Sequence, residues 1–140
     1  MLRRLSPQSR MIVEQAEAFA RKYQQDYIDS EHVLLAIAET SNSRAGQLLR
    51  QNGVTSENLR KTVEAVLTAH TPEYVTGRLP GTIHFRNIIA RAVEIAESRQ
   101  SAAVDPEHLL LALSREKDST AIQALQSLGL DPKKIEQMLA

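Results

Sequence analysis

Two Glu-His pairs, Glu31-His32 and Glu107-His108, are the residues whose types could do chemistry. A carboxylate beside an imidazole can transfer protons or hold a divalent metal. The pairs lie far apart in the sequence, and neither is part of a His-Glu-x-x-His motif, the spacing of a zinc-binding helix. We therefore expect no metal and no cofactor. We interpret both histidines as structural residues that bond a neighbouring loop carbonyl.

Catalytic motifs are missing from the 140 residues. The sequence has no cysteine, which excludes a cysteine nucleophile, a disulfide framework and a thiolate-bound metal. It also has no Gly-x-Ser-x-Gly motif. Its five glycines do not form the Gly-x-x-x-x-Gly-Lys-Ser/Thr loop that holds ATP phosphates. We expect a protein that is not an enzyme.

The Glu-His motif belongs to an internal repeat. The segment from Asp29 to Ile37 returns as the segment from Asp105 to Leu113, at an offset of 76 residues. At that offset, residues 5–64 and 81–140 share sixteen identities. Composition alone would give roughly four or five. Two copies fill the chain, so the sequence predicts one duplicated domain over residues 1–140. Repeat one covers about 5–68, a linker 69–81, and repeat two 82–140.

Four helices are expected in each repeat, eight in total, and the fold class is all-α with a pseudo-twofold axis. The first helix has apolar residues at helical spacing and a polar residue at its start, Ser6 in repeat one and Thr82 in repeat two. The second begins at Asp29 or Asp105 and is nearly continuously apolar, which indicates a central, buried helix. A buried strand is the alternative for so short an apolar run, but the capping residues favour a helix.

The later helices of each repeat follow the same pattern. The third helix should end at Gly53 or Gly129, where a left-handed residue is expected. The fourth should carry Leu59, Val63, Val66 and Leu67 in repeat one, and Ile135, Met138 and Leu139 in repeat two. Prolines and glycines within residues 69–81 indicate the linker.

Charge and composition narrow the class of protein further. Seventeen basic and seventeen acidic residues give a net charge of zero, which argues against a dedicated binder of nucleic acid or of anionic membranes. The longest apolar run, residues 33–38, is far too short to span a membrane. Residues 1–5 are followed by no apolar signal-peptide core, so we expect a cytoplasmic protein.

The duplicated Glu-His-Leu/Val-Leu-Leu-Ala-Leu/Ile helix and the glycine-ended third helix resemble the Clp N-terminal (repeat) domain of the ClpA, ClpB and ClpC unfoldases. The Thr82-Ile83-His84 segment looks most like the ClpC type. The resemblance covers about residues 5–140. It implies an all-helical domain that docks protein clients or adaptors for a Clp ATPase and protease assembly, by binding rather than catalysis.

The resemblance also implies a ligand. In ClpC-type domains of some bacteria, the glutamates that match Glu31 and Glu107 hold the guanidinium of phosphoarginine. The matching hydroxyl residue at the start of the first helix holds the phosphate, which pairs Glu31 with Ser6 and Glu107 with Thr82. A carboxylate can bind a guanidinium through two hydrogen bonds, and a helix start with a hydroxyl can bind an anion. The alternative is that both glutamates only cap their helices and stabilise the helix dipole.

Apolar residues outside the helical patterns could form a binding surface. Leu5 lies near the chain start, and Tyr74, Val75 and Leu79 lie in the linker. They could form a groove for client or adaptor segments between the repeats. The alternative is that they pack between the two repeats.

Two further functional classes remain open from the sequence. One is a free-standing accessory protein that binds and regulates the Clp machine. The other is a helical nucleic-acid-binding module, against which the neutral charge counts.

Overall fold

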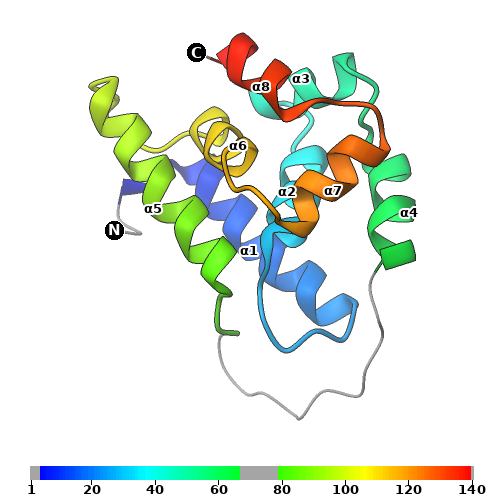
Figure 1. Cartoon of the computed structure of the whole chain (residues 1–140). Helices are drawn as coiled ribbons and strands as arrows, with labels where there is room; N and C mark the ends of the chain where they lie inside the picture. Colours follow the sequence, from blue (N-terminus) through cyan, green and yellow to red (C-terminus); the bar gives the residue numbers. More distant parts are fainter. Residues whose placement is uncertain (1–3, 67–78, 140) are drawn as a thin grey trace.

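The computed structural model describes residues 4–66 and 79–139. These residues contain eight α-helices and no β-strand (Figure 1). The all-α prediction is thereby confirmed for these residues. The helix bounds are α1 (Pro7–Lys22), α2 (Ser30–Glu39), α3 (Arg44–Gln51), α4 (Ser56–Val66), α5 (Ile83–Ser98), α6 (Pro106–Ser114), α7 (Thr120–Ser127) and α8 (Pro132–Leu139).

The first helix of each repeat begins at the expected capping residue. Ser6 Oγ accepts a hydrogen bond from the Ser9 N–H at 3.1 Å, and Thr82 Oγ1 accepts one from the Phe85 N–H at 3.2 Å. Each bond satisfies one of the backbone donors that a helix start leaves without an intrahelical partner. The predicted starts of α1 and α5 are therefore confirmed.

Helices α2 and α6 form the centre of the molecule. Their apolar segments, residues 33–37 and 109–113, are fully inaccessible to solvent. Figure 1 shows the two helices between α5 on one side and α4 on the other. Such continuous burial explains why these segments are apolar on every face rather than along one stripe.

The third helix of each repeat ends at a glycine. Gly53 and Gly129 follow α3 and α7 with φ angles of +85° and +84°, a conformation that glycine adopts at little cost. The structure confirms both predicted helix ends.

The two repeats cross over at their helix starts. The segment before α1 pairs with the segment before α6: the Ser6 N–H donates to the Val104 carbonyl at 3.0 Å. The equivalent segment before α5 pairs with the segment before α2: the Thr82 N–H donates to the Ile28 carbonyl at 2.9 Å. Each repeat therefore presents its first helix start to the second helix of the other repeat.

The fourth helices contain the expected apolar residues as far as the structure describes them. Leu59, Val63 and Val66 all lie in α4. Leu59 and Val63 are buried, whereas Val66, the last residue of α4, is 54% exposed. Leu67 lies outside the described residues. In α8, Ile135 and Leu139 are buried and Met138 is partly buried.

Candidate functional site

The start of α2 and the start of α5 meet around Asp29. The Asp29 carboxylate accepts a hydrogen bond from the Ser30 N–H at 2.7 Å and caps α2. The same oxygen accepts a second bond from the Thr82 hydroxyl at 2.8 Å. The Thr82 hydroxyl therefore donates its one hydrogen to Asp29. A ligand bound at this hydroxyl would lie beside the Asp29 carboxylate.

Glu31 lies in the first turn of α2 and is only 4% exposed. The Ser30 hydroxyl donates to its Oε1 at a long 3.5 Å. Burial, with the neighbouring Asp29 charge as a smaller cause, raises the pKa of Glu31 from 4.5 to about 7. The hydrogen bonds of the helix start and the charge of His84 act in the opposite direction. Glu31 is thus a buried acid that is partly protonated near neutral pH.

His32 and His108 are capping residues. The Nδ1 atom of each accepts the backbone N–H of the aspartate three residues earlier, at 2.9 Å in both repeats. The partner is an amide rather than the loop carbonyl that we expected. In repeat one, the His32 Nε2 atom is buried without a hydrogen-bond partner among the described residues. Burial lowers the pKa of His32 from 6.5 to about 4, so the ring is neutral at physiological pH.

The equivalent site in repeat two is more open. Glu107 is half-buried at the start of α6, next to the segment that pairs with Ser6. The Ser6 hydroxyl donates to the Ser9 hydroxyl at 3.1 Å and not to an aspartate. The Ser6 segment and the helix start that carries Glu107 therefore lie at the same crossover.

The expected pairing of these residues was wrong. The structure brings Thr82 to the helix start of Glu31, and Ser6 to the helix start of Glu107. The cause is the crossover between the repeats, which joins each first helix to the second helix of the other copy. Both candidate sites therefore contain residues from both repeats.

The expected apolar surface is also corrected. Leu5 is 4% exposed and Leu79 is 7% exposed, and both belong to the hydrophobic core. Leu5 pairs with Val104 at the crossover between the repeats. The Leu79 N–H donates to the Glu17 carboxylate at 2.7 Å. Neither residue presents an apolar surface to a partner. Tyr74 and Val75 lie outside the described residues.

A polar cluster that the sequence analysis missed surrounds Glu116, between α6 and α7. This buried carboxylate accepts hydrogen bonds from Asn87 at 3.0 Å and Arg91 at 2.9 Å, and it contacts His84 Nδ1 at 2.8 Å. Burial acts to raise the pKa of Glu116, but these three partners outweigh it and hold the pKa below its usual value. The position matching Glu116 in repeat one is Thr40, so the repeat pattern gave no signal for this cluster.

Neither a metal-ligand cluster nor a membrane-spanning helix is present among the described residues. Across 4–66 and 79–139, no three His, Asp or Glu side chains gather closely enough to hold a metal ion. None of the helices in this part of the chain combines the length and the apolar character needed to cross a bilayer.

Comparison with known proteins identifies relatives across the whole chain. The family model described as the Clp repeat (R) N-terminal domain matches residues 4–128 and 82–140. The rice protein "Chaperone protein ClpC1, chloroplastic" is 26% identical over 135 residues, which are 96% of this chain but 15% of the relative. This chain therefore spans a small part of the length of that curated relative.

Solved structures show the same fold. The N-terminal domain of ClpD from Arabidopsis thaliana superposes with a TM-score of 0.82 at 19% identity, covering 98% of this chain and 92% of that one. A complex of the ClpV N-domain with VipB peptide superposes with a TM-score of 0.75 at 19% identity, covering 99% and 86%. At these identities the likeness shows the fold alone.

Proposed function

Because the chain belongs to the Clp repeat (R) N-terminal domain family, we propose that it is a docking domain, which binds protein clients or adaptors for an ATP-driven Clp unfoldase. The observation that carries this proposal is the family match over almost the whole described chain. The ClpV N-domain, which has the same fold, is named as a complex with a peptide. Reversible binding of a client would raise its concentration near the unfoldase. A cytoplasmic location stays a prediction.

Within this function, the two acidic helix starts are proposed as ligand sites of unequal strength. Glu107 with Ser6 is the stronger site for a phosphorylated guanidinium, because its carboxylate is accessible and its hydroxyl is not bonded to an acid. Glu31 with Thr82 is the weaker site. A phosphate there would break the bond from Thr82 to Asp29 and would lie beside the Asp29 carboxylate.

Calorimetry with free phosphoarginine tests the ligand. We expect one site to dominate the heat of binding, Glu107→Ala to remove that heat, and Glu31→Ala to leave most of it. Free arginine and inorganic phosphate are the ligand controls. If the intact chain gives no heat, or if both variants bind as the parent does, this ligand assignment is wrong.

Docking itself needs a separate measurement. Fluorescence anisotropy with labelled casein, unmodified or phosphorylated on arginine, reports binding of an unfolded client to the full chain. We expect saturable binding, tighter for the phosphorylated form. The absence of binding to either form, together with silent calorimetry, would count against a client-docking domain.

A further inference from the structure

An Asn-Gly pair, Asn52-Gly53, follows α3 in repeat one. Of the four asparagines in the sequence, Asn52 alone precedes a glycine. The matching pair in repeat two is Leu128-Gly129, so only repeat one carries the side-chain amide here. The backbone nitrogen after an asparagine can attack the side-chain carbonyl carbon. A glycine hinders this attack least, because it has no Cβ.

The reaction is deamidation, and water is its only co-reactant. The Gly53 nitrogen loses its proton and forms a bond to Asn52 Cγ, while the side-chain nitrogen takes up that proton and leaves as ammonia. Water then opens the resulting five-membered succinimide at either of its two carbonyl groups. The product is an aspartate or an isoaspartate, whose main chain runs through the former side chain. No electron is transferred, and no cofactor is needed.

The folded chain holds this pair in an unreactive geometry. Asn52 has a ψ angle of 21°, typical of a helix end, and this angle turns the Gly53 nitrogen away from the Asn52 side chain. The Gly53 N–H also donates to the Arg50 carbonyl at 3.1 Å. The attacking nitrogen therefore points away from its target and is engaged in a hydrogen bond.

The side-chain amide of Asn52 is held by contacts in both repeats. Its Nδ2 atom donates to the Leu48 carbonyl within α3 at 2.8 Å and to the Met138 sulfur in α8 at 3.7 Å. Figure 1 shows α3 and α8 at the same end of the molecule, and Asn52 is half-buried there. The pair can reach the reactive geometry only when the end of α3 opens locally and leaves α8.

Deamidation would alter this contact permanently. A carboxylate cannot donate to the Leu48 carbonyl, and its negative charge would lie at the C-terminal end of α3, where the helix dipole is also negative. An isoaspartate would also lengthen the main chain by one atom just before Gly53, whose φ of +85° closes the helix. Both products therefore oppose closure of the α3 end against α8.

We propose that Asn52-Gly53 is a site of spontaneous deamidation, whose rate is set by the opening of the contact between α3 and α8. The modification accumulates in molecules in which this contact opens, and it weakens the contact afterwards. It is therefore a covalent record of local unfolding between the two repeats. It is independent of the ligand sites at the acidic helix starts.

Mass spectrometry measures the reaction at this residue. The full chain is incubated at mildly alkaline pH, folded or unfolded in guanidinium chloride, and is then digested with trypsin. Cleavage after Arg50 and Arg60 gives the peptide 51–60, which contains Asn52 and Asn58. Deamidation adds about 1 Da, and fragment ions show which residue carries it. We expect the reaction at Asn52 to be roughly tenfold or more slower in the folded chain, because it is confined to locally opened molecules. Asn58 precedes Leu59 and is the internal control, which should stay largely intact.

A variant in α8 tests whether the contact between the helices sets the rate. Met138→Ala removes the α8 side of the contact, so the folded chain should deamidate several-fold faster at Asn52. Gln137→Ala changes the exposed neighbour in α8 and is the matched control, which should leave the rate unchanged. Guanidinium unfolding gives the globally unfolded fraction of each variant, and a rate above that fraction reports the local opening.

A further variant imitates one product of the reaction. The thermal unfolding midpoint of Asn52→Asp should lie roughly 2–6 °C below that of the parent, the shift expected for the loss of one hydrogen bond in a domain of this length. Gln51→Glu places the same charge at an exposed position of the same helix end and should shift the midpoint less.

Three results would overturn the proposal. They are equal rates at Asn52 in the folded and unfolded chains, a Met138→Ala rate explained by its globally unfolded fraction alone, and an unfolding midpoint of Asn52→Asp equal to that of the parent. The docking function is tested separately, by the experiments with phosphoarginine and casein.

Discussion

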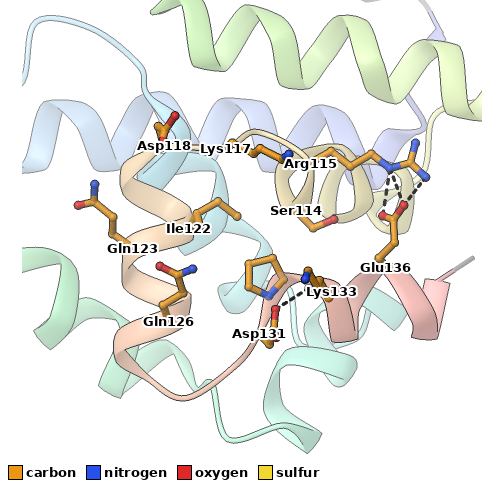
Figure 2. Close-up of a pocket in the computed structure, with 11 residues that line it drawn as sticks. Ser114, Arg115, Lys117, Asp118, Ile122, Gln123, Gln126, Asp131, Lys133 and Glu136 are labelled. Carbon is orange, nitrogen blue, oxygen red and sulfur yellow. Dashed lines mark hydrogen bonds and ion pairs between the residues drawn. The ribbon is translucent and has the colours of Figure 1, made fainter.

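The two repeats share a motif but not an environment. Glu31 is buried beside an aspartate that also bonds Thr82, whereas Glu107 is half-buried. An added Cβ at Gly46 would collide with the Thr40 carbonyl oxygen after α2, whereas the matching residue of repeat two is the buried Ile122, which lines a groove between α6, α7 and α8 (Figure 2). Duplication therefore repeated the local structure, and a few substitutions gave each copy a different surface. We expect repeat one to contribute more to the rigid core and repeat two to present most of the accessible binding groups.

The largest expected effect concerns pH and the buried pair Glu31-His32. The pKa of Glu31 rises from 4.5 to about 7 on folding, so its stabilising contribution is present below pH 4.5 and is lost as pH rises through 7. The pKa of His32 falls from 6.5 to about 4, so its contribution is present above pH 6.5 and is lost as pH falls through 4. The two effects oppose each other between pH 4.5 and 6.5.

Single substitutions should therefore show how each residue alone changes the free energy of unfolding with pH. With Glu31→Gln, the free energy of unfolding should rise with pH between 4 and 6.5. With His32→Gln, which keeps an acceptor for the Asp29 N–H, it should fall between 4.5 and 7. Each change can reach about 3 kcal/mol, since one pKa unit corresponds to about 1.4 kcal/mol. Urea unfolding from pH 4 to 8 measures this, with the half-buried Glu107→Gln as the matched control. Profiles parallel to that of the parent would contradict the assignment.

The next effect concerns the close packing at Gly46. With Gly46→Ala, the new Cβ would lie 2.3 Å from the Thr40 carbonyl oxygen and 3.0 Å from that of Ile37. These are backbone atoms that cannot rotate away, so we expect a loss of about 1–3 kcal/mol despite the better helix propensity of alanine. Thermal unfolding measures it. The exposed neighbour Gln47→Ala is the control and should change stability little. Equal stability of the two variants would show that α3 can move away from α2.

The smallest expected effect is the coupling energy of an exposed ion pair that occurs at matching positions in both repeats. The ion pair of Glu39 with Arg60 in repeat one occupies the same positions as the ion pair of Arg115 with Glu136 in repeat two, with the signs reversed. Exchanging the charges by Glu39→Arg/Arg60→Glu should restore most of what each single change loses. The coupling should be about 0.2–1 kcal/mol, typical of exposed pairs. A double-mutant cycle in urea measures it, and additive losses would mean that the pair contributes nothing.

Much of the fold could be predicted because its signals are local. Ser6, Thr82, Asp29 and Asp105 were identified as helix starts because a short polar side chain bonds backbone donors within three residues. Gly53 and Gly129 were identified as helix ends because a left-handed residue is favourable for glycine. The exposure of Val66 could not be predicted, because periodicity does not show where the packing against a helix face stops.

The candidate sites could be predicted only in part. Glu31 and Glu107 were singled out correctly as polar residues at helix starts, but their partners were exchanged. Leu5 and Leu79 are buried, which agrees with the alternative that they pack within the domain and not with a binding surface. The cluster at Glu116 and the groove at Ile122 left no repeated pattern at all. Each of these features depends on contacts between segments that lie far apart in the chain.

By itself, the sequence determined the helices, the duplication and the neutral, cysteine-free character of the protein. Helix capping and periodicity act over three or four residues, so one sequence is enough to detect them. Only the tertiary structure decided which helix start meets which, that Glu31 is buried more deeply than Glu107, and that a groove opens in repeat two. Those outcomes follow from the crossover of the repeats and from side-chain volume at a helix contact, which are properties of the packed chain.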